Sequence, residues 1–150
     1  MTVRVQTQDF DVGFEIKQLR VARPDVGAVV SFVGQVRDLN GGNTIARLTL
    51  EHYPGMTEKS LEAIVNQAKS RWNIMDATII HRVGTLQPLD QIVLVAVSSA
   101  HRNEAFSACE FMMDYLKTEA PFWKKEATAE GEQWLEAKET DETARKRWEK

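Results

Sequence analysis

The sequence predicts an α+β fold in a single domain, residues 1–150, whose C-terminal tail from about residue 139 to 150 is polar. Several short runs rich in β-branched residues predict strands, and two long segments carry apolar residues at helical spacing. The two kinds of element alternate irregularly, and many neighbouring strands are expected to be antiparallel. A chain of 150 residues is long enough to bury one sizeable core. We therefore expect sheets covered by two main helices.

The N-terminal third alternates between extended and helical patterns. Phe14 and Leu19 are the residues expected to face inward from the short first helix. The loop Asp38–Asn43 contains paired glycines, which suit a tight or mobile connection, so the strands on either side of it are expected to form a hairpin. Strands are predicted over residues 3–7, 27–36 and 45–52, and the short helix over residues 11–21.

The remainder of the chain contains the two long helices. Thr57 is a plausible N-cap for the first of them, and Ser99 for the second, which Pro121 must end. Trp148 lies in the otherwise polar tail and indicates that the tail docks on something. The helices are predicted over about 58–72 and 99–120, and strands over 77–83, 91–98, 122–128 and 133–137, the last two as a hairpin.

Composition excludes several classes of function. The formal net charge of -3 argues against a protein that coats nucleic acid or an anionic membrane. With Cys109 as its one cysteine, the chain can form no internal disulfide, which suits a cytoplasmic protein. The N-terminus has no apolar signal region, and no apolar run approaches the roughly 18 residues that span a bilayer.

Two lysines flank the proline that ends the second long helix. Lys117 and Lys124 lie on either side of Pro121, among aromatic residues, in Asp114-Tyr-Leu-Lys-Thr-Glu-Ala-Pro-Phe-Trp-Lys-Lys-Glu126. A lysine held against apolar rings loses water and becomes useful as a base, a nucleophile or an anion-binding charge. Alternatively, both lysines bury only their stems and keep their charges in water. The spacing alone favours this second interpretation.

Further cationic residues lie at the ends of predicted elements. Arg37 closes the first long strand, and His101 and Arg102 lie where a strand becomes a helix. A helix N-terminus favours anions, so this pair makes a phosphate site plausible, although Arg102 is equally well read as an ordinary solvated residue. Lys117 should lie some four turns further along the same helix. Either the two groups contact different parts of a substrate, or a second subunit completes the site.

The other candidate residues are better read as structural. His52 and His81 lie in predicted strands, and no second histidine falls at metal-ligand spacing, so no metal site is expected. Cys109 lies on the apolar stripe of its helix, which favours a buried thiol over a nucleophile.

Three linked motifs stand out along the chain: Leu50-Glu-His-Tyr-Pro-Gly-Met56, Ser99-Ala-His-Arg102 and Met113-Asp-Tyr-Leu-Lys-Thr-Glu-Ala-Pro-Phe-Trp-Lys124. Together they resemble one family, the large, catalytic subunit of molybdopterin synthase. The resemblance extends from about Gly27 to Ala137. It implies an α/β-hammerhead fold with an additional small antiparallel β subdomain, and a homodimer. Each protomer of that family binds a small ubiquitin-like sulfur carrier, which gives a heterotetramer.

The resemblance also implies an activity. In that family the carrier's C-terminal thiocarboxylate enters the large subunit, and two carrier molecules in turn each donate one sulfur to cyclic pyranopterin monophosphate, forming the dithiolene of molybdopterin. No metal or bound cofactor is implied for this sulfurtransferase step, and no nucleic acid or membrane partner. The alternative is a non-catalytic scaffold that binds a ubiquitin-like partner.

The family's functional residues match positions of this chain. Its essential lysine falls on Lys117 and its second active-site lysine on Lys124. Its substrate-binding residues fall on Arg37, His101, Arg102 and Lys138. Lys138 is a departure, because an arginine is expected there. A lysine keeps the charge but cannot bind a phosphate or carboxylate through a bidentate fork.

Overall fold

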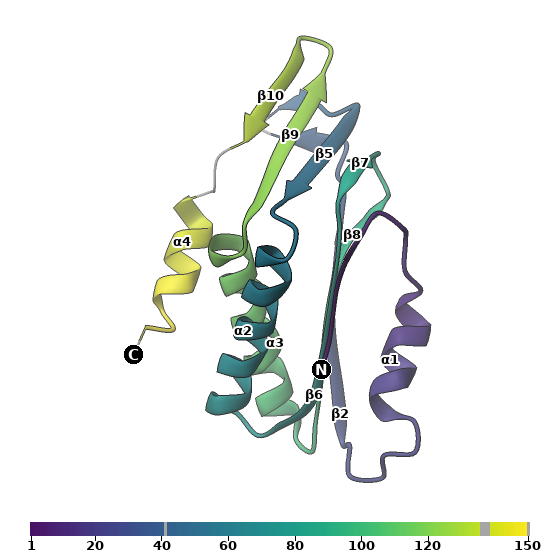
Figure 1. The fold of residues 1–150 in the computed structure, drawn as a ribbon, viewed down its shortest axis with the longest axis vertical. Coiled ribbons are helices and arrows are strands. Elements are labelled where there is room, and N and C mark those ends of the chain that lie inside the picture. The colour runs from purple at the N-terminus through teal and green to yellow at the C-terminus, as the bar shows by residue number, and fades with distance from the viewer. Residues whose placement is uncertain (41, 136–138, 150) are drawn as a thin grey trace.

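The computed structural model describes residues 1–40, 42–135 and 139–149, and it has the predicted α+β class (Figure 1). Its main sheet combines one parallel pair, β1 with β6, with antiparallel pairs on the other side. The strand order in this main sheet is β1 (Thr2–Gln6), β6 (Ile74–Arg82), β8 (Gln91–Ser99) and β2 (Ala28–Gln35).

Helices cover both faces of the main sheet (Figure 1). Helices α2 (Met56–Arg71) and α3 (Arg102–Glu119) pack on one face, where alternate residues of β6 and β8 such as Ile79 and Val95 are fully buried. Helix α1 (Val12–Arg20) packs on the other face. None of the helices in the described ranges is long and apolar enough to cross a membrane.

The prediction of which residues α1 buries was correct for Leu19 and wrong for Phe14. Leu19 is buried as expected, but Phe14 is 57% exposed. Val12 and Leu19, seven residues apart, form the stripe that packs against Ile80 and Leu94. Phe14 follows Val12 by two residues, which places it on the opposite side of the helix.

A second antiparallel sheet lies beyond one end of the main sheet (Figure 1). The hairpin predicted between residues 27–36 and 45–52 is therefore wrong, because β2 and β5 belong to different sheets. Leu48 and Leu50 of β5 bury themselves against Leu86 in a separate small core instead. The order in this second sheet is β10 (Gly131–Leu135), β9 (Phe122–Thr128), β5 (Arg47–His52) and β7 (Gly84–Leu86), and β3 (Leu39–Asn40) pairs with β4 (Asn43–Thr44).

A sharp corner at Pro121 connects α3 to β9. Helix α3 ends at Glu119, and Pro121 cannot continue it because proline has no backbone N–H. The fully buried Thr57 donates its hydroxyl hydrogen to Tyr53 O (3.0 Å), with Pro121 O at 3.3 Å as an alternative acceptor. Thr57 is thus not the N-cap of α2, which is Gly55; it ties the start of α2 to the corner.

The tail docks on α3, as Trp148 indicated. Helix α4 (Glu139–Lys146) lies beside α3, and the Trp148 indole donates a hydrogen bond to Asp114 (2.7 Å). The Trp148 ring also contacts Trp72 and Phe111 edge to face, at centroid distances of 5.5 and 5.6 Å. The tail therefore covers the outer side of the helix that carries Lys117.

One aromatic stack joins the two sheets. His81 at the end of β6 is 3% exposed, and its ring stacks on Phe122 of β9 with centroids 3.8 Å apart and an interplanar angle of 18°. Burial is the main cause that lowers the pKa of His81 from 6.5 to about 3, and the charges of Lys124 and Lys117 lower it further. The imidazole is therefore neutral at physiological pH.

Leu89 is strained, and replacing it should stabilise the fold. It has φ +79° at the third position of the turn Gln87–Asp90, which is closed by a hydrogen bond from Asp90 N–H to Gln87 O (3.0 Å). A type II turn favours glycine at this position. Leu89→Gly should raise the free energy of unfolding by about 0.5–1 kcal/mol. The strain that is relieved, ~1–2 kcal/mol, exceeds the cost of the additional conformational entropy that glycine gives the unfolded chain. Leu89→Ala, which keeps the Cβ, should change it little. Equal urea midpoints for both variants would contradict the strain.

The neutral His81 should make the fold sensitive to acid. The pKa of His81 is about 3 in the folded state and 6.5 in the unfolded state. Its contribution to stability is therefore complete above pH 6.5 and declines as the pH falls toward 3. For each unit by which the pH falls below 6.5, the free energy of unfolding should decrease more in the parent than in His81→Phe. The difference should be up to about 1.4 kcal/mol per pH unit. Urea unfolding at pH 7, 6 and 5 measures this difference. Parallel pH dependences of parent and variant would rule it out.

Candidate active site

A cavity of about 170 Å³ brings together three of the predicted site residues, Lys117, Lys124 and Arg37. They arrive from three different elements: the last turn of α3, the strand β9 and the segment that follows β2. We call this the lysine cavity. The rest of its lining is Gln35, Val36, Asn40, Ile45, Leu48, Ile92, Glu126 and Leu135.

Local structure explains why each lysine reaches the cavity. Lys117 is the basic residue in the last turn of α3, where the helix dipole favours a positive charge. Lys124 pairs with Leu50 of β5 and Leu135 of β10, in the middle of the second sheet. Lys125 faces the other way, because side chains alternate along a strand, and it forms an ion pair with Glu132 (3.1 Å). Only one of these two adjacent lysines is thus placed for chemistry in the cavity.

A buried carboxylate in the cavity was not predicted. Glu126 is 8% exposed, and Asn40 Nδ2 lies 2.9 Å from each of its carboxylate oxygens and donates to them. The signal was present in the sequence, because Glu126 follows Lys124 by two residues and so shares its face of β9. Asn40 was not predictable, since it comes from the short strand β3, 86 residues away. Two lysines and Arg37 still leave the cavity with more positive than negative charge.

Arg37 lies between the lysine cavity and a larger one of about 740 Å³. The larger cavity is bounded by the turn that contains Pro88 and Leu89. Two backbone hydrogen bonds fix this turn to the end of β2, from Val36 N to Asp90 O and from Leu89 N to Val36 O, both 2.9 Å. The exposed guanidinium of Arg37 therefore has room on both sides for an anionic ligand.

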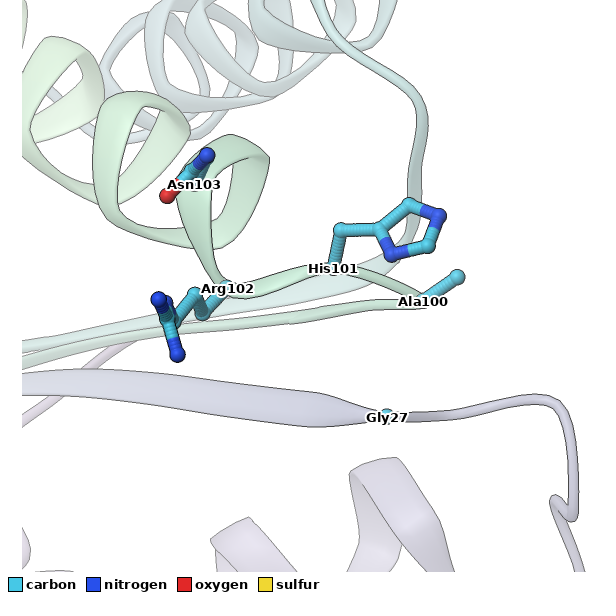
Figure 2. A pocket seen from close by; sticks show the side chains of 5 residues that line it. All are labelled: Gly27, Ala100, His101, Arg102 and Asn103. Carbon is cyan, nitrogen blue, oxygen red and sulfur yellow. The ribbon is translucent and has the colours of Figure 1, made fainter.

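His101 and Arg102 do not join this group. They line a separate pocket of about 430 Å³ with Gly27, Ala100 and Asn103, at the start of α3, and their side chains leave the turn in opposite directions (Figure 2). Gly27 lies so close to this turn that a Cβ there would approach Ala100 O to 2.2 Å. Arg102 and Lys117 are about 22 Å apart along the helix axis. Within one chain they cannot contact the same small group.

The remaining candidates are placed as follows. Burial and the neighbouring Glu110 raise the pKa of Cys109 to about 12, which confirms a structural thiol. His81 Nδ1 lies 2.7 Å from Arg82 O, and His52 pairs with Phe122 across β5 and β9. Lys138 lies outside the described residues. No group of three or more His, Cys, Asp or Glu side chains in residues 1–40, 42–135 and 139–149 is arranged to hold a metal ion.

The lysine cavity has the properties needed to stabilise negative charge. Its walls include the apolar side chains of Val36, Ile45 and Leu48, while Lys117 is exposed and Lys124 is half-buried. Lys117 comes from a helix and Lys124 from a strand, so the ammonium groups of two regular elements line the same space. Such a site suits the binding of an anion, or a reaction in which negative charge develops.

Comparison with known proteins identifies the family of the chain. A family model described as "MoaE protein" matches residues 5–119. The molybdopterin synthase catalytic subunit of Ralstonia nicotianae is 63% identical over 147 residues, covering 98% of this chain and 84% of the relative. That of Escherichia coli is 56% identical over 144 residues, covering 96% and 95%.

Solved structures show the same architecture. The molybdopterin biosynthesis MoaE protein of Burkholderia ambifaria matches with a TM-score of 0.85 and 56% identity, covering 99% of this chain and 98% of that one. Molybdopterin synthase from Staphylococcus aureus matches with a TM-score of 0.82 and 33% identity, covering 88% and 95%. The chain therefore belongs to the MoaE family, together with the catalytic subunits of molybdopterin synthase.

Proposed function

We propose that this chain is the catalytic subunit of a molybdopterin synthase. It transfers two sulfurs, each from the C-terminal thiocarboxylate of a small ubiquitin-like carrier, to cyclic pyranopterin monophosphate, which becomes the dithiolene of molybdopterin. The observation that carries this proposal is the convergence of Lys117, Lys124 and Arg37 on one cavity, from three elements. Both reactants are anions, and a cationic site with partly apolar walls is suited to bind them.

Lys117 is the central group in the proposed reaction. The thiocarboxylate sulfur attacks a carbon of the substrate and displaces the oxygen bonded to that carbon, which leaves the carrier's acyl group bonded to the substrate through sulfur. Water then cleaves that acyl group, the sulfur remains on the substrate, and the carrier leaves with a carboxylate. A second carrier repeats the transfer at the neighbouring carbon, because a dithiolene contains two sulfurs. Both the attack and the hydrolysis develop negative charge on oxygen or sulfur, which the Lys117 ammonium stabilises. Lys124, across the cavity, assists it or holds the carrier's terminus.

The phosphate of the substrate needs its own cationic contacts. Arg37 supplies one at the edge of the lysine cavity. We assign His101, Arg102 and Lys138 to the same task. Because Arg102 of one chain lies about 22 Å from its own Lys117, we propose that His101 and Arg102 act on the lysine cavity of a second copy in a homodimer.

The carrier is the second partner in this proposal. A solved complex from Helicobacter pylori 26695 contains subunits 1 and 2 of the molybdopterin-converting factor, and its matched chain shares the fold of this one at 22% identity and a TM-score of 0.72. We propose that a carrier binds each protomer here, giving a heterotetramer in the cytoplasm. The small second sheet is the additional β subdomain of an α/β-hammerhead, within a single domain of residues 1–150.

Removing the ammonium of Lys117 should nearly abolish turnover. In a single-turnover assay with thiocarboxylated carrier and cyclic pyranopterin monophosphate, Lys117→Ala should slow dithiolene formation by about 10²–10³-fold, because one preformed charge contact is lost. Lys125→Ala is the matched control, since that lysine faces away from the cavity. The carrier should still bind both variants. An unchanged rate in Lys117→Ala would keep the synthase activity but remove Lys117 from the centre of the mechanism, whereas no product from the parent chain, with the carrier still bound, would favour the non-catalytic scaffold.

A mixed dimer tests whether two protomers share a site. When a Lys117→Ala chain is paired with an Arg102→Ala chain, one of the two shared sites regains both residues. Activity should recover to about half of the parent value per mixed dimer, although each variant alone is inactive. If the mixed dimer stays inactive, then each protomer uses its own Arg102 and Lys117.

A further inference from the structure

His81 is a buried titratable group that the proposed reaction leaves without a role. It lies next to the last residue of the inner strand β6 and pairs with Val93 of β8 and Val5 of β1, so its backbone is fixed on both sides. Its Nδ1 lies 2.7 Å from Arg82 O. A carbonyl oxygen can only accept, so Nδ1 carries the ring proton and donates it. This hydrogen bond fixes the tautomer and the orientation of the ring.

The fixed ring supports the first residue of β9. Phe122 stacks on His81 and also packs against the apolar residues of both the main core and the small core of the second sheet. Its N–H donates to Ala120 O (2.9 Å), so it is held directly after the Pro121 corner. Lys124 follows Phe122 by two residues on the same face of the strand. The placement of Phe122 therefore sets where Lys124 enters the lysine cavity.

We propose that His81 is a positioning residue for Lys124, acting through its stack with Phe122 as an aromatic support that carries no charge. This inference rests on the proposed function and adds a residue to it. The titratable groups whose charges act on His81 are Lys124 of β9, Lys117 of α3 and His52 of β5. A charge on the imidazole would repel both lysines at the point where they must hold an anion. An aromatic ring without a charge is thus what the position requires.

Competitive acetylation of lysines tests the positioning without any need for activity. The labelling rates of Lys124 and Lys125 are measured by mass spectrometry in the parent, His81→Leu and His81→Phe, each first shown to be folded by circular dichroism. In His81→Leu, the new side chain is apolar but cannot stack on Phe122. The labelling rate of Lys124 should then rise about threefold or more, because the start of β9 is less restrained. In His81→Phe, which keeps the stack, it should return to within about twofold of the parent. Lys125, on the opposite face, should not change in either variant.

The same variants are then compared in the single-turnover assay. His81→Leu should lower the rate of sulfur transfer at saturating substrate by about tenfold with little change in KM, and His81→Phe should restore most of it. Unchanged Lys124 labelling in His81→Leu would overturn the proposal, whatever the activity. Equal loss of rate in both variants would also overturn it, and would indicate that the imidazole itself takes part. If the parent chain is inactive while the labelling pattern holds, the proposed function fails and the positioning remains.

Discussion

The stack of His81 on Phe122 is the contact on which the arrangement of the site depends. The main sheet and the second sheet have separate cores, and the chain passes from α3 into β9 through a corner of two residues, Ala120 and Pro121. At that corner the aromatic stack fixes the start of β9 against the end of β6. Lys117 lies before the corner and Lys124 after it, so the geometry of the corner determines the distance between the two charges.

Charge and burial then act together in the lysine cavity. Two ammonium groups and a guanidinium close together would repel one another, and the buried Glu126 offsets part of that repulsion. Asn40 donates to both oxygens of Glu126, which holds this carboxylate within the wall of the cavity. The imbalance toward positive charge is local, because the whole chain carries a formal net charge of -3. A small acidic protein can thus bind anionic reactants at one site.

Much of this could be predicted from sequence, because the informative features are local. The strand runs, the helix that ends at Pro121 and the alternation that separates Lys124 from Lys125 all follow from spacing. The pairing of strands did not follow, since nothing local indicates that β2 joins β8 while β5 joins β9. The contribution of Asn40 was hidden for the same reason, and the role of His81 depends on a ring that is 41 residues away in the chain. The separation of Arg102 from Lys117 was predictable, because a helix has a fixed rise per residue.

In the proposed reaction, the sulfur of the product comes from the carrier. The most direct measurement is a single turnover with a carrier whose thiocarboxylate contains heavy sulfur, followed by the mass of the pterin product at each time. With the parent chain, the heavy isotope should enter the product at the same rate at which the carrier returns to its carboxylate form. Carrier that loses its sulfur without any label appearing in the pterin would show that the chain does not transfer sulfur to the substrate.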